Sequence, residues 1–254
     1  MSLVVDKKDG VARVTLNRPD VRNAFDDALI ASLTKAFDEL NRDTTVRVVV
    51  LAGNGPAFCA GADLNWMKRM AGYGYDENLR DARALAEMLA TLDGIDKPTI
   101  ARVHGPAFAG GTGLVAACDI AVGTPEAKLG LSPATISPYV MRAIGARAAS
   151  RYFLTAEVFD AAEALRIGML SALVPAAELD AAVDGLVQHL LAGGGEAHAR
   201  IKDLIRQVAG RPIDDALKAD TARRIAEIRA SPEGKEGIAA FLEKRKPKWF
   251  SGKS

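Results

Sequence analysis

The chain has 254 residues, of which 49% are hydrophobic and 26% carry a charge, as is usual for a globular protein with a sizeable core. Its formal net charge is +1 and it has no long basic or acidic run, so neither a nucleic acid nor another polyanion is expected as a partner. The two cysteines, Cys59 and Cys118, suit a reducing compartment, and neither has the spacing that predicts a metal site.

The sequence shows no sign of secretion or of a membrane anchor. Its first residues, MSLVVDKKDG, lack the basic start and the long apolar run of a signal peptide. No stretch approaches the ~18 uninterrupted apolar residues of a membrane-spanning helix. We therefore expect a cytoplasmic protein with no membrane partner.

The first half of the chain alternates between strand and helix patterns. Asp9 and Gly10 separate two strand-like segments, which predicts a β-hairpin. Asp26 precedes a segment with apolar residues at spacings of three and four, which is typical of an amphipathic helix. Further along the chain we expect a buried strand over 46–52, a helix over 78–92, a strand over 98–103, a short helix over 114–117 and a strand over 119–123.

From about Pro133 onward the patterns are helical. Ser231 and Pro232 supply an N-cap and a first-turn proline for a last helix that ends near Lys244. Strand–helix alternation followed by helices alone indicates an α/β core with a C-terminal helical extension. The helices expected before the last one cover 161–167, 179–191, 196–209 and 213–229.

Two turns of small residues stand out, GPAFCAGADL (55–64) and GPAFAGGTGL (105–114). Each follows a predicted strand and leads to a helix start, near Asp63 and near Thr112. In parallel α/β folds, sites form beyond the carboxyl ends of the strands. Small residues let a ligand approach the main chain, and two N–H donors that converge on a carbonyl oxygen form an oxyanion hole.

Turns of small residues also occur in other settings. Glycine-rich turns also serve packing alone, and spacing does not decide between packing and function. The second turn is not G-x-G-x-x-G and no P-loop lysine follows, so phosphate binding is disfavoured. No G-x-S-x-G elbow of a hydrolase is present. Cys59 has no basic partner nearby in sequence, which favours a buried thiol over a nucleophile.

Taken together, the segments resemble the enoyl-CoA hydratase/isomerase (crotonase) superfamily over nearly the whole chain. The stretches NWMKRMA and SPATISPYVMRAIG are similar to the branch that includes methylglutaconyl-CoA hydratases. The segments that carry the resemblance are LNRPDVRNAFD (16–26), GNGPAFCAGADLNWM (53–67), KPTIARVHGPAFAGGTGLVAACDIAV (97–122), the helical region from Ala149 to Gly168, and FLEKRKPKWF (241–250).

The resemblance implies a fold and an activity. The fold is an α/β spiral of repeated ββα units over residues 1–190, with a C-terminal helical trimerisation region over residues 191–254. The protein is then expected to form a homotrimer or a hexamer made of two trimers. The implied activity is an enoyl-CoA hydratase (a lyase) that adds water to a short or branched 2-enoyl-CoA in fatty acid or amino acid catabolism. No separate cofactor is expected, because coenzyme A is part of the acyl-CoA substrate.

The resemblance also assigns roles to individual residues. The backbone amides of Ala62 and Gly110 form the oxyanion hole. Arg22 is available to a phosphate of coenzyme A. The residues expected to bind coenzyme A are Val21, Arg22, Ala24, Ala60, Asp63, Leu64 and Trp249, and those expected at the acyl pocket are Asn65, Trp66, Met67 and Gly113.

The chain departs from the family pattern at both positions of the catalytic carboxylates. Many hydratases carry a glutamate three residues after the second oxyanion donor, where this chain has Gly113. The branch that it resembles often has glycine there too and relies on a second glutamate. Between Lys128 and Pro133 the chain is about seven residues shorter than the family pattern, and no glutamate lies there. We interpret Glu126 as a surface charge.

This short junction has two explanations, and the sequence leaves both open. Either a mobile stretch that carries the glutamate belongs between Lys128 and Pro133, or the deletion is real. We expect the first, because a deletion would remove much of a strand and leave backbone groups unpaired. If the deletion is real, an acyl-CoA-binding protein without catalysis and an enoyl-CoA isomerase gain weight.

Overall fold

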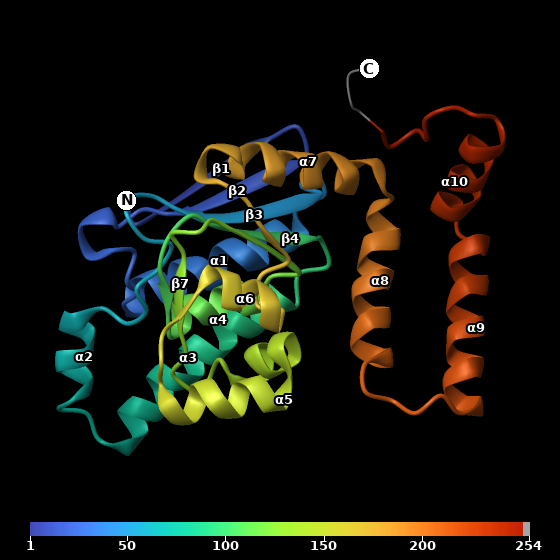
Figure 1. Ribbon diagram of the computed structural model, residues 1–254. Coiled ribbons are helices and arrows are strands. Elements are labelled where there is room, and N and C mark those ends of the chain that lie inside the picture. Colours follow the sequence, from blue (N-terminus) through green and yellow to red (C-terminus); the bar gives the residue numbers. More distant parts are fainter. Residues whose placement is uncertain (251–254) are drawn as a thin grey trace.

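The computed structural model describes residues 1–250, and its centre is a mainly parallel sheet (Figure 1). The strand order is β1-β2-β3-β4-β6-β9, in which β1 and β2 pair antiparallel and the other neighbours pair parallel. The strands are β1 (Leu3–Lys8), β2 (Val11–Leu16), β3 (Val48–Gly53), β4 (Thr99–Val103), β6 (Ile120–Gly123) and β9 (Ala172–Leu173).

The predicted hairpin is confirmed. Strands β1 and β2 pair from Leu3 opposite Leu16 to Lys8 opposite Val11. Asp9 and Gly10 connect them, both with positive φ (49° and 81°), as the backbone of a tight two-residue turn requires.

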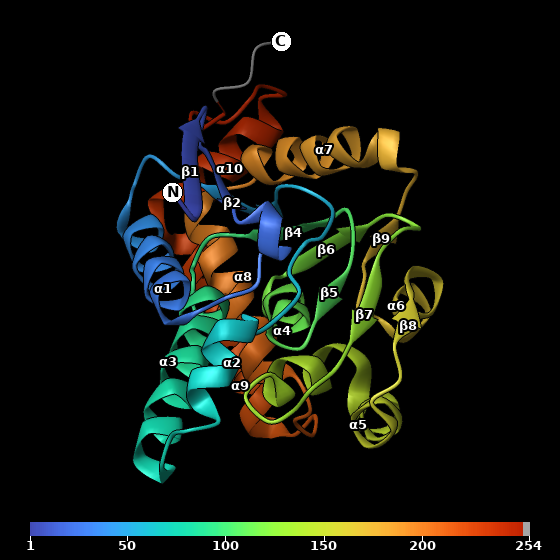
Figure 2. The ribbon, with the colours of Figure 1, turned by 90° about the vertical axis from the view of Figure 1, so that its left-hand side faces the viewer.

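A second, three-stranded sheet lies beside the first one and was not predicted (Figure 2). Its strands have two or three residues each and come from distant parts of the chain. Leu129 pairs with Ala107 on one side and with Phe159 on the other. These strands are β5 (Ala107–Phe108), β7 (Lys128–Gly130) and β8 (Phe159–Asp160).

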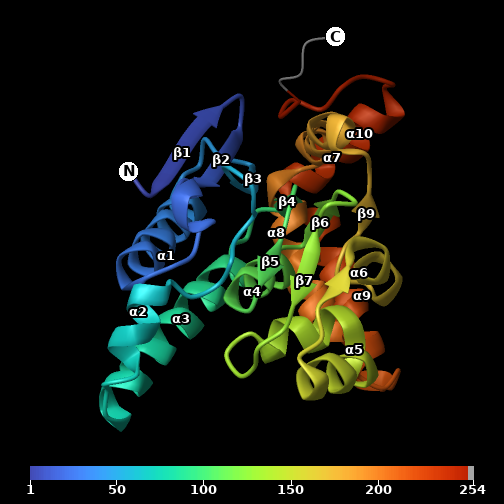
Figure 3. The ribbon, with the colours of Figure 1, turned by 60° about the vertical axis from the view of Figure 1, so that its left-hand side comes forward.

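Helices cover both faces of the large sheet (Figure 3). On one face, α7 (Leu179–Ala192) packs Leu179 and Val183 against strand residues that include Val48 and Ile100. On the other face the alternate strand residues, such as Val49 and Leu51, pack against three helices. These are α1 (Asp27–Arg42), α3 (Tyr75–Asp93) and α4 (Gly110–Ala117), and α2 (Leu64–Met70) and the first turns of α3 extend away from the sheet.

The chain after Pro133 is mainly helical, as predicted, but the short strands β8 and β9 interrupt the expected run of helices. Gly168 ends α6 in the left-handed conformation (φ 89°), and the Ser231 hydroxyl accepts from the N–H of Gly234 as the N-cap of α10. Figure 1 shows the last three helices together on one side of the sheet. The helices are α5 (Ser137–Thr155), α6 (Ala161–Ile167), α8 (Gly195–Val208), α9 (Asp215–Ala230) and α10 (Pro232–Leu242).

The division expected at residues 190 and 191 falls in the last turn of α7. It stays a prediction. Residues 251–254 of the expected helical region lie outside the described residues. Within residues 1–250, no helix combines the length and the apolar character needed to cross a membrane.

The short junction after Lys128 is part of the fold. Strand β7 passes into α5 within residues 131–136, and Leu131 and Ile136 are buried in the main core. The chain is described without a gap from residue 1 to residue 250, so the structure gives no support to a further stretch at this point. Neither position expected for a catalytic glutamate carries a carboxylate in this chain.

Candidate active site

The first small-residue turn follows β3 and ends at the N-terminus of α2. Gly61 has a φ of 88°, a conformation that glycine adopts without strain. Ala62 follows it, and Asp63 is the N-cap of α2, because its Oδ1 accepts from the N–H of Asn65 at 2.8 Å and of Trp66 at 3.3 Å. The backbone therefore reverses just before Ala62.

The second turn follows β4 and β5 and ends at the N-terminus of α4. Ala109 has a φ of 49° and a ψ of −116°, a conformation that costs a non-glycine residue about 1–3 kcal/mol. Gly110 is the first residue of α4, two residues earlier than the predicted helix start at Thr112. Residues with strained backbone conformations cluster at functional sites.

The amides of Ala62 and Gly110 are available to a ligand. No hydrogen bond from either N–H is found within residues 1–250, whereas the amides of Asp63 and Ala109 are engaged. The N–H of Asp63 donates to the oxygen of Phe25 at 2.8 Å, and the N–H of Ala109 donates to the oxygen of Gly130 at 2.9 Å. Among the described residues, Ala62 and Gly110 thus each carry an unengaged N–H, and the oxyanion-hole role that the resemblance assigns to them stays a prediction.

The two turns contact each other. The N–H of Cys59 donates to the oxygen of Pro106 at 3.2 Å, and the N–H of Phe108 donates to the oxygen of Cys59 at 2.9 Å. A Cβ added to Gly61 would lie 2.8 Å from the oxygen of Phe108, closer than real Cβ contacts allow. Only glycine fits there, and both turns lie at the same edge of the fold.

Hydrogen bonds keep the Asp63 carboxylate charged. Burial by itself raises the pKa of Asp63, but the N–H groups of Asn65 and Trp66 and the Arg18 guanidinium outweigh it, so the pKa lies below its usual value. The Arg18 Nη2 donates to Asp63 Oδ2 at 2.9 Å. An ionised N-cap interacts favourably with the positive end of the helix dipole of α2.

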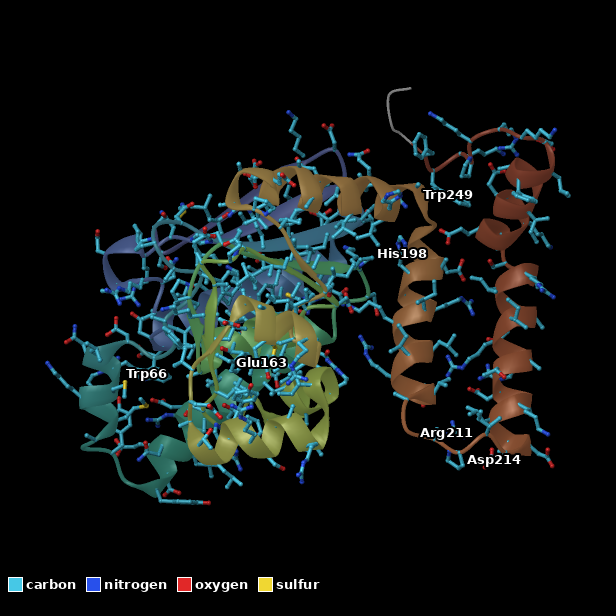
Figure 4. The ribbon with its side chains drawn as sticks, viewed as in Figure 1. Trp66, Glu163, His198, Arg211, Asp214 and Trp249 are labelled. Atoms are coloured by element: carbon cyan, nitrogen blue, oxygen red, sulfur yellow. The ribbon has the colours of Figure 1, made fainter. Side chains whose placement is uncertain are left out.

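The structure gathers most of the residues expected to bind coenzyme A. The N–H of Ala60 donates to the oxygen of Arg22 at 2.9 Å, which joins the segment before α1 to the first turn. Val21, Arg22 and Leu64 are exposed around this junction, whereas Ala24 is buried beneath it. Trp249 lies at the other side of the molecule, where its Nε1 donates to the oxygen of Ala192 (Figure 4).

The residues expected at the acyl pocket face in different directions. Trp66 is 4% exposed, and its indole Nε1 donates to Asp81 Oδ2 of α3 at 3.0 Å, beside a cavity of about 630 Å³ between α1 and α3. Asn65 and Met67 point to the surface of α2, and Met67 is 49% exposed. Gly113 is buried inside α4 and its Cα faces Ile136. Met67 is therefore more exposed to solvent than Trp66.

The remaining polar candidates give no catalytic group. Cys59 is fully buried, burial raises the pKa of its thiol to about 12, and its Sγ donates to the oxygen of Asn23. This confirms the interpretation as a buried thiol. His104 is bonded through Nε2 to the oxygen of Gly55 at 2.9 Å. Within residues 1–250, no group of three or more His, Cys, Asp or Glu side chains is placed to hold a metal.

Glu126 does not replace the missing glutamate. It is exposed in the turn between β6 and β7, and Thr124 lowers the pKa of its carboxyl by hydrogen bonding. It lies four residues before Gly130, the end of β7 that bonds to the second turn. Glu126 lies outside β7, before Lys128, and so beyond the end of the strand opposite to Gly130.

Arg18 and Phe25 support the first turn, and neither was predicted as a site residue. Arg18 bonds to the Asp63 carboxylate, and Phe25 bonds to the backbone on both sides of Ala62. Both belong to the motif over 16–26, but a motif shows that its residues recur together and not what each of them touches.

The mainly parallel sheet, the small second sheet and two adjoining turns with free amides define the crotonase type of α/β fold. A family model described as enoyl-CoA hydratase/isomerase matches residues 6–252, and the chain belongs to this family.

Relatives and solved structures agree with this membership. The chain is 34% identical to the 2,3-dehydroadipyl-CoA hydratase of Escherichia coli, over 96% of this chain and 97% of the relative. The crystal structure of an enoyl-CoA hydratase from Shewanella pealeana superposes with a TM-score of 0.94 and 40% identity, over 98% of this chain and 96% of that one. An enoyl-CoA hydratase from Mycobacterium smegmatis superposes with a TM-score of 0.90 and 34% identity, over 98% of this chain and 99% of that one.

Proposed function

We propose that the chain binds a short or branched 2-enoyl-CoA and adds water to its double bond, with the amides of Ala62 and Gly110 holding the thioester oxygen. The observation that carries the proposal is the pair of unengaged amides in two adjoining turns. When water adds to Cβ of the enoyl group, the thioester oxygen gains negative charge as an enolate forms. Each preset donor at such an oxygen contributes about 10²–10³ in rate.

The coenzyme A part of the substrate follows the residues around the first turn. Ala24 and Ala60 add little side-chain bulk beside this path, and Leu64 offers an apolar surface that is 74% exposed. The exposed guanidinium of Arg22 is placed to pair with a phosphate. Met67, on the surface of α2 next to the first turn, is the residue that we propose for contact with the acyl group.

The proposal is tested by hydration assays with crotonyl-CoA and 3-methylglutaconyl-CoA. Water addition removes the conjugation between double bond and thioester, so the near-ultraviolet absorbance of the substrate falls. We expect turnover of at least one short or branched substrate. Intact protein that binds these thioesters but hydrates none of them would exclude the hydratase.

A second function is favoured by one observation, the lack of a carboxylate at Gly113 and over residues 131–136. Hydration needs groups that activate water and protonate Cα, and each contributes about 10²–10⁴ in rate. Without them the same two amides suit an acyl-CoA-binding protein without catalysis, or an enoyl-CoA isomerase. Calorimetric binding with no product identifies the first, and a moved double bond without water uptake identifies the second.

We further propose that the C-terminal helices join copies of the chain into a trimer or a pair of trimers. Large apolar side chains are exposed on them, including Ile225 (47%) and Phe241 (82%). Leu217 of α9, in contrast, is buried within the chain at 4% exposure. A contact of Trp249 with coenzyme A would require a second copy, because within one chain it lies far from the first turn. Light scattering at micromolar concentration tests the assembly, and a stable monomer would contradict it.

A further inference from the structure

Phe25 contacts both turns and so connects them. It is 1% exposed and lies just before the N-cap of α1. Its N–H donates to the oxygen of Gly61 at 2.8 Å, and its oxygen accepts from the N–H of Asp63 at 2.8 Å. Ala62 stands between these two bonded residues, so the backbone of Phe25 fixes the plane of its amide from both sides.

The ring of the same residue lies against the second turn. A Cβ added to Gly110 would be 2.5 Å from Cε2 and 2.7 Å from Cζ of Phe25. Carbon atoms in contact are normally ~3.5–4.0 Å apart, so the ring edge already touches the main chain of Gly110. The backbone of Phe25 therefore holds one free amide, and its side chain supports the residue that carries the other.

Phe25 has little freedom of its own. Arg18 Nη1 donates to the oxygen of Ala24 at 2.6 Å, on one side of Phe25. On the other side, Asp26 accepts from the N–H of Leu29 at 2.9 Å and pairs with Arg18 at 3.2 Å. Hydrogen bonds thus fix both neighbours of Phe25, and a group fixed in this way can set the distance between two others.

We propose that Phe25 is a positioning residue that sets the separation of the Ala62 and Gly110 amides. This inference rests on the proposed role of those amides as donors to a thioester oxygen. Donors to an oxyanion must both lie about 2.7–3.1 Å from one point, and a misplacement of ~1 Å costs about 10²-fold in rate. A smaller side chain removes the ring edge and lets the first turn of α4 settle toward the space that it leaves.

The test compares Phe25→Leu with Phe37→Leu. Phe37 lies in α1, is fully buried and belongs to the same core, so the same atoms are removed away from the two turns. The probe is cinnamoyl-CoA, whose absorption maximum moves to longer wavelength when donors polarise its thioester carbonyl. Binding is measured separately by calorimetry, and folding by urea denaturation.

We expect a red shift with the wild type and with Phe37→Leu, and at most half of that shift with Phe25→Leu. The dissociation constant of Phe25→Leu should stay within about threefold of the wild type, because the ring that is removed faces Gly110 and not the residues proposed to bind coenzyme A. A full shift with folded Phe25→Leu overturns the inference. No shift with the wild type, despite binding, overturns the proposed donor role itself and the inference with it.

A second variant covers a failure of Phe25→Leu to fold. Phe25→Met keeps most of the side-chain volume but not the flat ring edge. A shift smaller than that of the wild type supports the inference, and an unchanged shift overturns it.

Discussion

Arg18 and Asp63 form an ion pair that joins the N-caps of two helices. The Arg18 Nη2 lies 2.9 Å from Asp63 Oδ2, and its Nη1 lies 3.2 Å from the carboxylate of Asp26. Asp63 caps α2 and Asp26 caps α1. One guanidinium thus fixes the starting points of both helices next to the amide of Ala62. The pair is largely shielded, because the side chains of Arg18 and Asp63 are 22% and 7% exposed.

Replacing Arg18 by glutamine should destabilise the protein by about 1–3 kcal/mol, because it leaves a buried carboxylate without its charged partner. Urea denaturation measures the change. The matched control is Arg69→Gln, whose partner Asp27 is mostly exposed, and its cost should stay below ~1 kcal/mol. Equal losses in the two variants would show that the Arg18 pair is no different from a surface pair.

The free energy of unfolding should depend on pH in the acid range because of the Asp63 carboxylate. Its folded pKa is lower than the usual 3.8, so its charge adds stability above pH 3.8, and this contribution is lost as the pH falls through the folded pKa. Asp63→Asn keeps a cap but not the charge. The difference in melting temperature between wild type and variant should be largest near neutral pH and shrink below pH 3.8. A difference that does not change with pH would contradict this assignment.

The helix ends were predictable because local groups make them. Asp26, Gly168 and Ser231 act through hydrogen bonds or backbone conformation within a few residues, and all three stand where the sequence placed them. The direction of a side chain is not local in this way. Trp66 faces α1 and α3, and Leu217 faces the interior of the chain, because helices distant in sequence decide which side is covered.

In the site, too, the features set by neighbouring residues were predictable and those set by residues distant in sequence were not. Small residues after a strand marked both turns, because only a sterically open backbone leaves its amides accessible. Strands β5, β7, β8 and β9 were missed, because two or three residues give no alternation to detect and their pairing joins segments far apart in sequence. Phe25 looked like any core residue, since the turn that its ring touches lies about 85 residues further along the chain.

Gly111 should not tolerate even one added carbon. A Cβ at this position would overlap the backbone oxygen of Cys59, which is fixed by its bond to Phe108. We expect Gly111→Ala to cost about 1–3 kcal/mol by overpacking and to displace the second turn. Gly185→Ala is the control, because it lies inside α7 with nothing within 4 Å of the new Cβ. It should stabilise the protein by about 0.5–1 kcal/mol. Thermal unfolding distinguishes the two variants. A Gly111→Ala variant as stable as the wild type would show that the turns separate easily.

A carboxylate placed at residue 113 should raise hydration, if the missing glutamate is what limits the chemistry. Gly113 faces the side chain of Ile136, so Gly113→Glu alone would clash. We therefore combine Gly113→Glu with Ile136→Ala, which makes room one helical turn after the free amide of Gly110. The control is Gly113→Gln with Ile136→Ala, which has the same shape without the charge.

The Gly113→Glu/Ile136→Ala variant should hydrate crotonyl-CoA about 10²-fold faster than the Gly113→Gln/Ile136→Ala variant, since a placed general base contributes that much. Its rate should rise with pH as the new carboxyl ionises, and burial should raise the pKa of that carboxyl above the usual range. The hydration rate of the Gly113→Gln/Ile136→Ala variant should not rise with pH. Binding of the substrate should be alike in both, because neither substitution touches the first turn. Equal rates in the two double variants, with equal binding, would mean that the lack of a carboxylate at this position does not limit the reaction.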